Sequence, residues 1–125
     1  MDFQGPRCFY CGLETEVDLH VDHVIPWAFV LEDRLWNLVL ACQTCNCSKS
    51  DRTPDDSSMN KLSERNKHLM EIIRTADLAS IATAIRRDLE PFTPEILESH
   101  VASLIRNCRD EGFGVWKRDH YSGAE

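Results

Sequence analysis

Four of the six cysteines in this 125-residue chain form two pairs with the spacing C-x-x-C. The first pair is Cys8 and Cys11, and the second is Cys42 and Cys45. Two thiolates at this spacing reach one metal ion from a tight turn, and a second such pair completes a tetrahedral site. The β-α-β pattern that flanks a thioredoxin-like redox motif is not visible, which leaves chance pairs of buried thiols as the other alternative. The cysteines therefore predict a structural Zn²⁺ site.

The segment between and after the cysteine pairs predicts a small set of elements that position its polar residues. Two stretches rich in Val, Leu and Ile, 19–28 and 35–41, favour short strands. Between them, Pro26 and the charged cluster 32–34 predict a compact loop. After the second cysteine pair, residues 45–52 favour a short helix that ends before a proline. The predicted order is strand, loop, strand and helix, with both ends held by zinc.

The segment from Cys8 to Arg52 resembles the HNH endonucleases, whose nuclease core is a ββα-metal fold. The matching pattern is C-x-x-C-G, then D-H-V-I-P, then W-N-L-V-L-A-C-x-x-C-N-x-x-K. A lone D-H pair carries little weight, but here several motifs occur in a fixed order and are framed by the cysteine pairs. The resemblance covers about 45 of the 125 residues. It implies metal-dependent hydrolysis of phosphodiester bonds.

The resemblance also implies a role for each polar residue of the motif. His23 matches the general base that takes a proton from the attacking water. Asp22 and Asn46 match the ligands of the catalytic divalent cation, which makes this the H-N-N variant of the pattern. Asn37 matches the residue that braces the loop and orients the base. General chemistry agrees, because a neutral imidazole suits proton transfer near neutral pH, and carboxylate and amide oxygens suit Mg²⁺ or Mn²⁺.

Several further side chains are candidates for substrate contacts or for the core. Lys49 looks like a contact to a substrate phosphate and Arg52 is a second candidate, although ordinary solvent exposure explains either residue equally well. His20 is expected to be a half-exposed strand histidine rather than a metal ligand. Trp27 and Trp36 are expected to fill the small core beneath the loop rather than to stack on bases.

After residue 53 the apolar pattern becomes helical. Stripes of apolar residues predict helices at about 58–74, 76–89 and 94–111, and Thr93 is the expected N-cap of the third. Cys108 lies on the stripe of the third helix and is expected in the core. Residues 113–121 are expected to add a short extended segment against the helices.

These expectations combine into an α+β protein with two parts. Residues 1–53 form a ββα-metal HNH core stapled by the four-cysteine zinc site, and residues 54–125 form a C-terminal extension of about three helices that packs on the core. In the favoured interpretation the apolar stripes of the extension pack on each other and on the core. The alternative leaves one stripe exposed for a protein partner or for a homodimer.

Composition limits the function further. The 21 acidic and 14 basic residues give a formal net charge of −7, which excludes a protein that coats nucleic acid by charge alone. No apolar run is long enough for a membrane span and the first residues lack a signal-peptide pattern, so a cytoplasmic protein is expected. The predicted function is hydrolysis of DNA with structural Zn²⁺ and catalytic Mg²⁺ or Mn²⁺. Two alternatives stay open: a zinc-stapled module that binds nucleic acid or protein without catalysis, and a ribonuclease that uses the same site.

Overall fold

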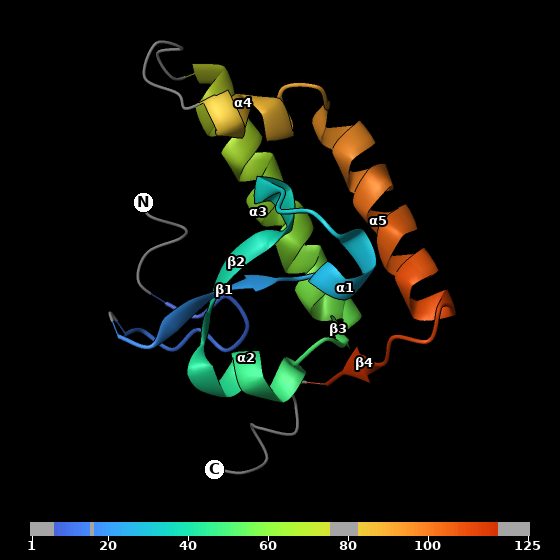
Figure 1. Cartoon of the computed structure of the whole chain (residues 1–125). Coiled ribbons are helices and arrows are strands. Elements are labelled where there is room, and N and C mark those ends of the chain that lie inside the picture. The colour runs from blue at the N-terminus through green and yellow to red at the C-terminus, as the bar shows by residue number, and fades with distance from the viewer. Residues whose placement is uncertain (1–6, 16, 76–82, 118–125) are drawn as a thin grey trace.

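The computed structural model places two strands and a helix in the first half of the chain (Figure 1). Strand β1 (Leu19–His23) pairs antiparallel with β2 (Leu38–Cys42), and helix α2 (Gln43–Lys49) follows β2 without a break. Asp22 lies opposite Val39 in this pairing. The predicted ββα order is therefore confirmed. The residues that the structure describes are 7–15, 17–75 and 83–117.

Two short helices shape the connection between the strands. Helix α1 (Trp27–Val30) follows Pro26 and ends at Leu31, whose φ of 58° lies in the left-handed region. The 3₁₀ helix η1 (Leu35–Asn37) then leads directly into β2. The predicted compact loop is thus built from helical turns, which bring the chain back beside β1.

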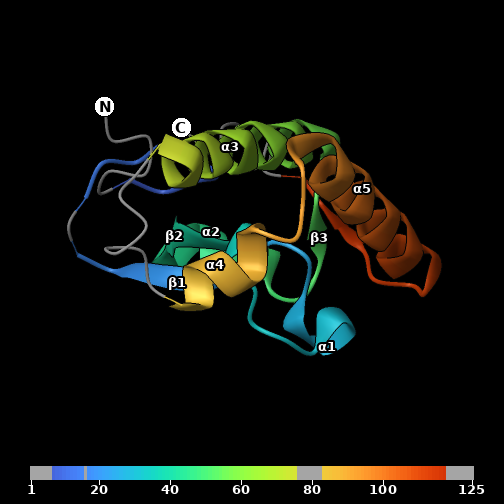
Figure 2. The same ribbon diagram turned by 90° about the horizontal axis from the view of Figure 1, so that it is seen from above.

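Three longer elements follow, namely α3 (Asp56–Thr75), α4 (Thr83–Leu89) and α5 (Pro94–Asp110). Helix α3 runs along one side of the β1–β2 hairpin, and α1 lies on the other side (Figure 2). The predicted cap of α5 is confirmed, because the Thr93 hydroxyl accepts an amide hydrogen bond of 3.1 Å from the first turn. The start of the predicted second helix, residues 76–82, lies outside the described residues. Within the described residues, no helix combines the length and the apolar character that a membrane crossing requires.

After α5 the chain returns to the ββα core, where a late strand pairs with the segment that follows α2. Strand β3 (Thr53–Pro54) pairs in parallel with β4 (Val115–Trp116). The Trp116 side chain is buried, and its indole Nε1 donates a hydrogen bond of 3.0 Å to Ser48 Oγ on α2. The predicted extended segment is confirmed at β4, whereas residues 118–121 lie outside the described part.

One hydrophobic cluster contains residues from both parts of the chain. Trp36 and Cys108 are buried in it, as expected. The same expectation for Trp27 is wrong, because its side chain is 50% exposed. No residue of α1 is fully buried, and Phe29 and Val30 of this helix, rather than Trp27, pack against the core. The boundary after residue 53 stays a prediction, and the cluster crosses it.

Candidate active site

The four paired cysteines come together at the open end of the hairpin. Their sulfur atoms all lie within 4.8 Å of one another, and Cys11 Sγ is 3.9 Å from Cys42 Sγ. Zinc–sulfur bonds of about 2.3 Å in a tetrahedron place the sulfurs about 3.8 Å apart, so the cluster fits a zinc ion. In each pair the backbone amide of the second cysteine donates to the sulfur of the first, with an N–Sγ distance of 3.5 Å in both turns. A hydrogen bond from Cys45, followed by nearby amides, lowers the pKa of Cys8 to about 4, whereas the same bond and burial raise the pKa of Cys45, so Cys8 is the thiolate of this hydrogen-bonded pair.

Asp22 is a buried carboxylate near the end of β1. The Tyr10 hydroxyl donates a hydrogen bond of 2.6 Å to Asp22 Oδ2, and Lys49 Nζ lies 3.4 Å from the same oxygen. Burial, and next the charge of Asp22, raises the pKa of Tyr10, so its hydroxyl stays a proton donor. Because Tyr10 lies between Cys8 and Cys11, the first cysteine turn also orients this carboxylate.

Lys49 differs from the expectation of a phosphate contact. Its side chain is 0% exposed, and Nζ donates a hydrogen bond of 2.9 Å to the backbone carbonyl of His23. Burial lowers the pKa of Lys49, and the neighbouring Asp22 opposes that shift. The last residue of α2 therefore points inward between the helix and β1, toward the Asp22 carboxylate and the His23 carbonyl.

Replacement of Lys49 is expected to destabilise the protein rather than to weaken substrate binding alone. Lys49→Ala leaves the Asp22 carboxylate buried without its cation, which costs roughly 3–5 kcal/mol of unfolding free energy. Urea denaturation measures the loss, and Lys67→Ala is the matched control because Lys67, on α3, makes exposed ion pairs with Glu64 and with Glu98 of α5. The control is expected to stay within about 0.5 kcal/mol of the wild type. Equal stability of the two variants would contradict the buried pair.

His23 ends β1 with its imidazole partly open to solvent, at 22% exposure. Its Nε2 lies 2.7 Å from Oδ1 of Asp33, which is 71% exposed. If this contact carries the imidazole proton, the lone pair of Nδ1 is the one that can accept a proton. The backbone carbonyl of His23 is fixed separately by Lys49.

Asn37 holds the segment that follows His23. Its Oδ1 accepts a hydrogen bond of 2.8 Å from the Ile25 amide, and its Nδ2 donates one of 2.9 Å to the Ile25 carbonyl. The Asn37 carbonyl accepts a further bond of 2.9 Å from the Val24 amide. The buried side chain thus has the contacts that a bracing role requires.

The remaining predicted residues lie on or after α2. Asn46 is half-buried and directly follows Cys45, on a helix that packs against β1. Arg52 is exposed, and its guanidinium donates to the carbonyls of Ser48 and Lys49 at the end of α2. It remains accessible to a phosphate, in contrast to Lys49.

Comparison with known proteins agrees with this arrangement. The family model for HNH endonucleases matches residues 8–52, which contain the cysteine cluster, the two strands and α2. Residues 8–52 form an HNH endonuclease domain. The same comparison indicates metal-dependent nuclease activity for this domain.

The HNH domain also has a distant curated relative. CRISPR-associated endonuclease Cas9 1 of Streptococcus thermophilus (strain ATCC BAA-491 / LMD-9) is 36% identical over 59 residues. The match covers 41% of this chain and 5% of that protein. The similarity therefore concerns one segment of each protein.

Two side chains of the HNH domain were not expected at the site. In the sequence, Tyr10 is one of the two residues between Cys8 and Cys11, and Asp33 is part of the charged cluster 32–34. Their hydrogen bonds to Asp22 and His23 span 12 and 10 residues. The position of Asp33 in a charged loop between the two strands is a weak signal for its contact with His23. Nothing in the sequence marks Tyr10 as a partner of Asp22.

Proposed function

We propose that this chain cleaves phosphodiester bonds in DNA with the help of a divalent cation. The observation that carries the proposal is the grouping of Asp22 and His23 at one end of β1, beside the helix that carries Asn46. This grouping lies inside the segment that matches the HNH endonuclease family.

His23 is the proposed general base. The exposed carboxylate of Asp33 orients the imidazole through Nε2, so that Nδ1 takes the proton of the attacking water. Asn37 keeps the following residues in place, and Lys49 fixes the His23 carbonyl. These contacts hold the base without closing the site to solvent.

Asp22 and Asn46 are the proposed ligands of Mg²⁺ or Mn²⁺. Such a cation, when bound, stabilises negative charge on the phosphate and on the leaving oxygen. Tyr10 holds one oxygen of the Asp22 carboxylate and leaves the other for the metal. Zn²⁺ in the four-cysteine cluster is structural in this proposal, since all four positions of a tetrahedron are taken by protein sulfurs.

The substrate is proposed to be DNA, contacted by Arg52 among other residues. Because the chain as a whole is acidic, binding has to come from local contacts rather than from net charge. A protein partner or a second copy on the helical extension stays a prediction. A cytoplasmic location also belongs to the proposal, because free thiols persist in a reducing compartment.

A plasmid-nicking assay tests the proposal. Zinc-loaded protein freed of other divalent cations is expected to nick supercoiled plasmid only after Mg²⁺ or Mn²⁺ is added. Single-stranded DNA and RNA are assayed in parallel under the same conditions. Cleavage of RNA alone would favour the ribonuclease, and no cleavage of any substrate by folded protein would favour the binding module.

A further inference from the structure

The turn that carries Asn37 is held by helix α3, outside the HNH domain. In residues 35–38, called the η1 turn below, the carbonyl oxygens of Leu35, Trp36 and Leu38 face α3. Arg65 Nη2 donates 3.2 Å to the Leu35 carbonyl, and Arg65 Nη1 donates 2.9 Å to the Leu38 carbonyl. Asn66 Nδ2 donates 3.0 Å to the Trp36 carbonyl, and its Oδ1 accepts from Arg65 Nε at 3.1 Å. Two neighbouring side chains thus bind three carbonyls of the turn.

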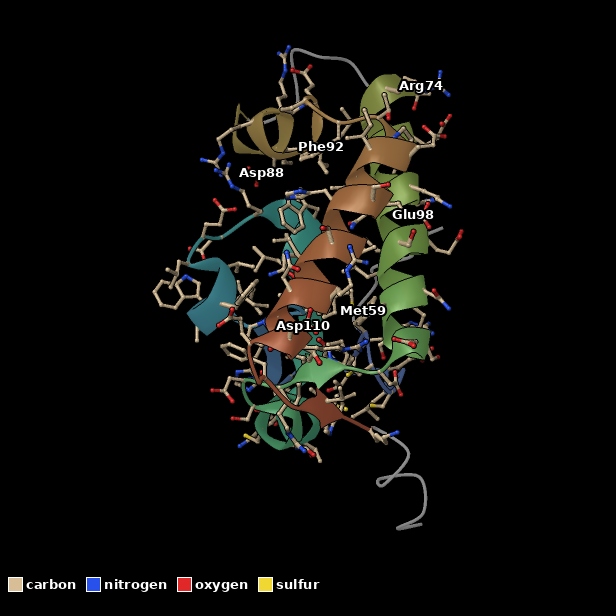
Figure 3. The ribbon with its side chains drawn as sticks, turned by 90° about the vertical axis from the view of Figure 1, so that its right-hand side faces the viewer. Met59, Arg74, Asp88, Phe92, Glu98 and Asp110 are labelled. Carbon is tan, nitrogen blue, oxygen red and sulfur yellow. The ribbon has the colours of Figure 1, made fainter. Side chains whose placement is uncertain are left out.

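Helix α4 holds the other side of the same turn. The Asp88 carboxylate accepts a hydrogen bond of 2.8 Å from the Leu35 amide and one of 3.0 Å from Arg34 Nη1. Figure 3 shows Asp88 between α4 and the teal segment that contains the η1 turn. Burial alone would raise the pKa of Asp88, but the hydrogen bonds from Arg87 and from residues 34–35 hold it below its ordinary value. The carboxylate is therefore charged when it binds the turn.

The η1 turn is in contact with the two residues that follow the proposed base, His23. Asn37 lies in the turn and binds the Val24 and Ile25 amides through its carbonyl and side-chain oxygens. These two residues directly follow His23. A shift of the turn would therefore move the chain next to the imidazole.

The chemistry of Arg65 argues for a positioning role. Arg65 is only 8% exposed, and burial lowers the pKa of its guanidinium to about 10. The guanidinium is therefore still charged at neutral pH. Burying a guanidinium costs free energy, and an apolar side chain of similar size often stabilises a protein as well or better. What an apolar side chain cannot do is fix two carbonyls at a set spacing, which the planar guanidinium does.

We propose that Arg65, Asn66 and Asp88 are positioning residues of the nuclease site, which hold the η1 turn so that Asn37 keeps His23 in a productive place. The proposal rests on the proposed function. It assigns the helical extension a part in the active site, although none of these three residues lies in the HNH domain.

Asn66→Ala and Asp88→Asn test the proposal in the full-length zinc-loaded protein. Amide hydrogen exchange is measured by NMR, and steady-state cleavage of plasmid is measured below the melting temperature of every variant. In both variants we expect the exchange rates of the Val24 and Ile25 amides to rise relative to the wild type. This rise is expected to be at least tenfold larger than the rise for the α5 amides. We expect kcat to fall by about tenfold or more with KM nearly unchanged, because small displacements of a catalytic group cost up to about 10²-fold in rate.

Ile105→Ala is the matched control, since it removes a buried α5 side chain that has no hydrogen-bonding group. It is expected to lower stability but to keep kcat, and to change exchange at Val24 and Ile25 no more than elsewhere. The proposal is overturned if Asn66→Ala and Asp88→Asn match this control in exchange or in kcat. A wild type that cleaves nothing would defeat the proposed function instead, while the exchange comparison would still decide whether these residues hold the turn.

Discussion

His23→Ala is expected to abolish cleavage while leaving the fold intact. Loss of a general base lowers the rate by on the order of 10²–10⁴-fold, and we expect the remaining cleavage to fall below detection in a nicking assay. The structural cost is small, because the imidazole is partly exposed and its hydrogen bond is to the exposed Asp33. The bond from Lys49 goes to the backbone carbonyl of His23 and survives the substitution.

The matched control is His20→Ala, which removes an exposed histidine three residues earlier on the same strand. Both variants are compared with the wild type in the Mg²⁺- or Mn²⁺-dependent plasmid assay and in thermal unfolding followed by circular dichroism. We expect wild-type melting in both, with cleavage lost only at position 23. A His23→Ala protein that cleaves at the full rate would remove His23 from the mechanism, and equal loss in both variants would point to the strand rather than to the base.

The ββα core could be predicted because its signals are local and mutually consistent. The two cysteine pairs precede and follow the hairpin along the chain and meet at its open end, the D-H motif ends β1, and the W-N motif lies in η1 directly before β2. The end of α2 before Pro54 and the cap of α5 at Thr93 follow from backbone chemistry within a few residues. These features need no knowledge of the tertiary contacts.

The direction of Lys49 could not be predicted in the same way. Helix α2 has only seven residues, which is too short for a periodic pattern to show which face is buried. A lysine is usually exposed, and here it is buried because the Asp22 carboxylate lies within 3.4 Å of it. Only the packing of α2 on β1 decides this outcome.

The contacts of the helical extension with the site are long-range and polar. Asn66 and Trp36 are 30 residues apart, and Asp88 and Leu35 are 53 residues apart. The apolar stripes of the helices indicate which positions face a core, but they assign polar residues such as Arg65 to solvent. A buried polar residue on a helix is therefore recognised only when its backbone partners are known.

Loss of one zinc ligand is expected to have the largest effect on stability. Cys8→Ser or Cys42→Ser should unfold the nuclease core, because metal binding at small structural zinc sites contributes on the order of 10 kcal/mol. Cys42 also belongs to the core and accepts the amide hydrogen bond that begins α2. Thermal unfolding by circular dichroism and the zinc-to-protein ratio by mass spectrometry measure the two losses.

Cys47→Ser is the matched control, because Cys47 is exposed and lies outside the four-sulfur cluster. It is expected to keep both its melting temperature and one zinc per chain. Normal melting with unchanged zinc in Cys8→Ser and Cys42→Ser would overturn the structural role of the metal. The expected loss extends to the proposed ligands of the catalytic cation, since Asn46 directly follows Cys45, and Tyr10, which holds Asp22, directly precedes Cys11. Zinc removal should therefore abolish the site even though zinc takes no part in the proposed chemistry.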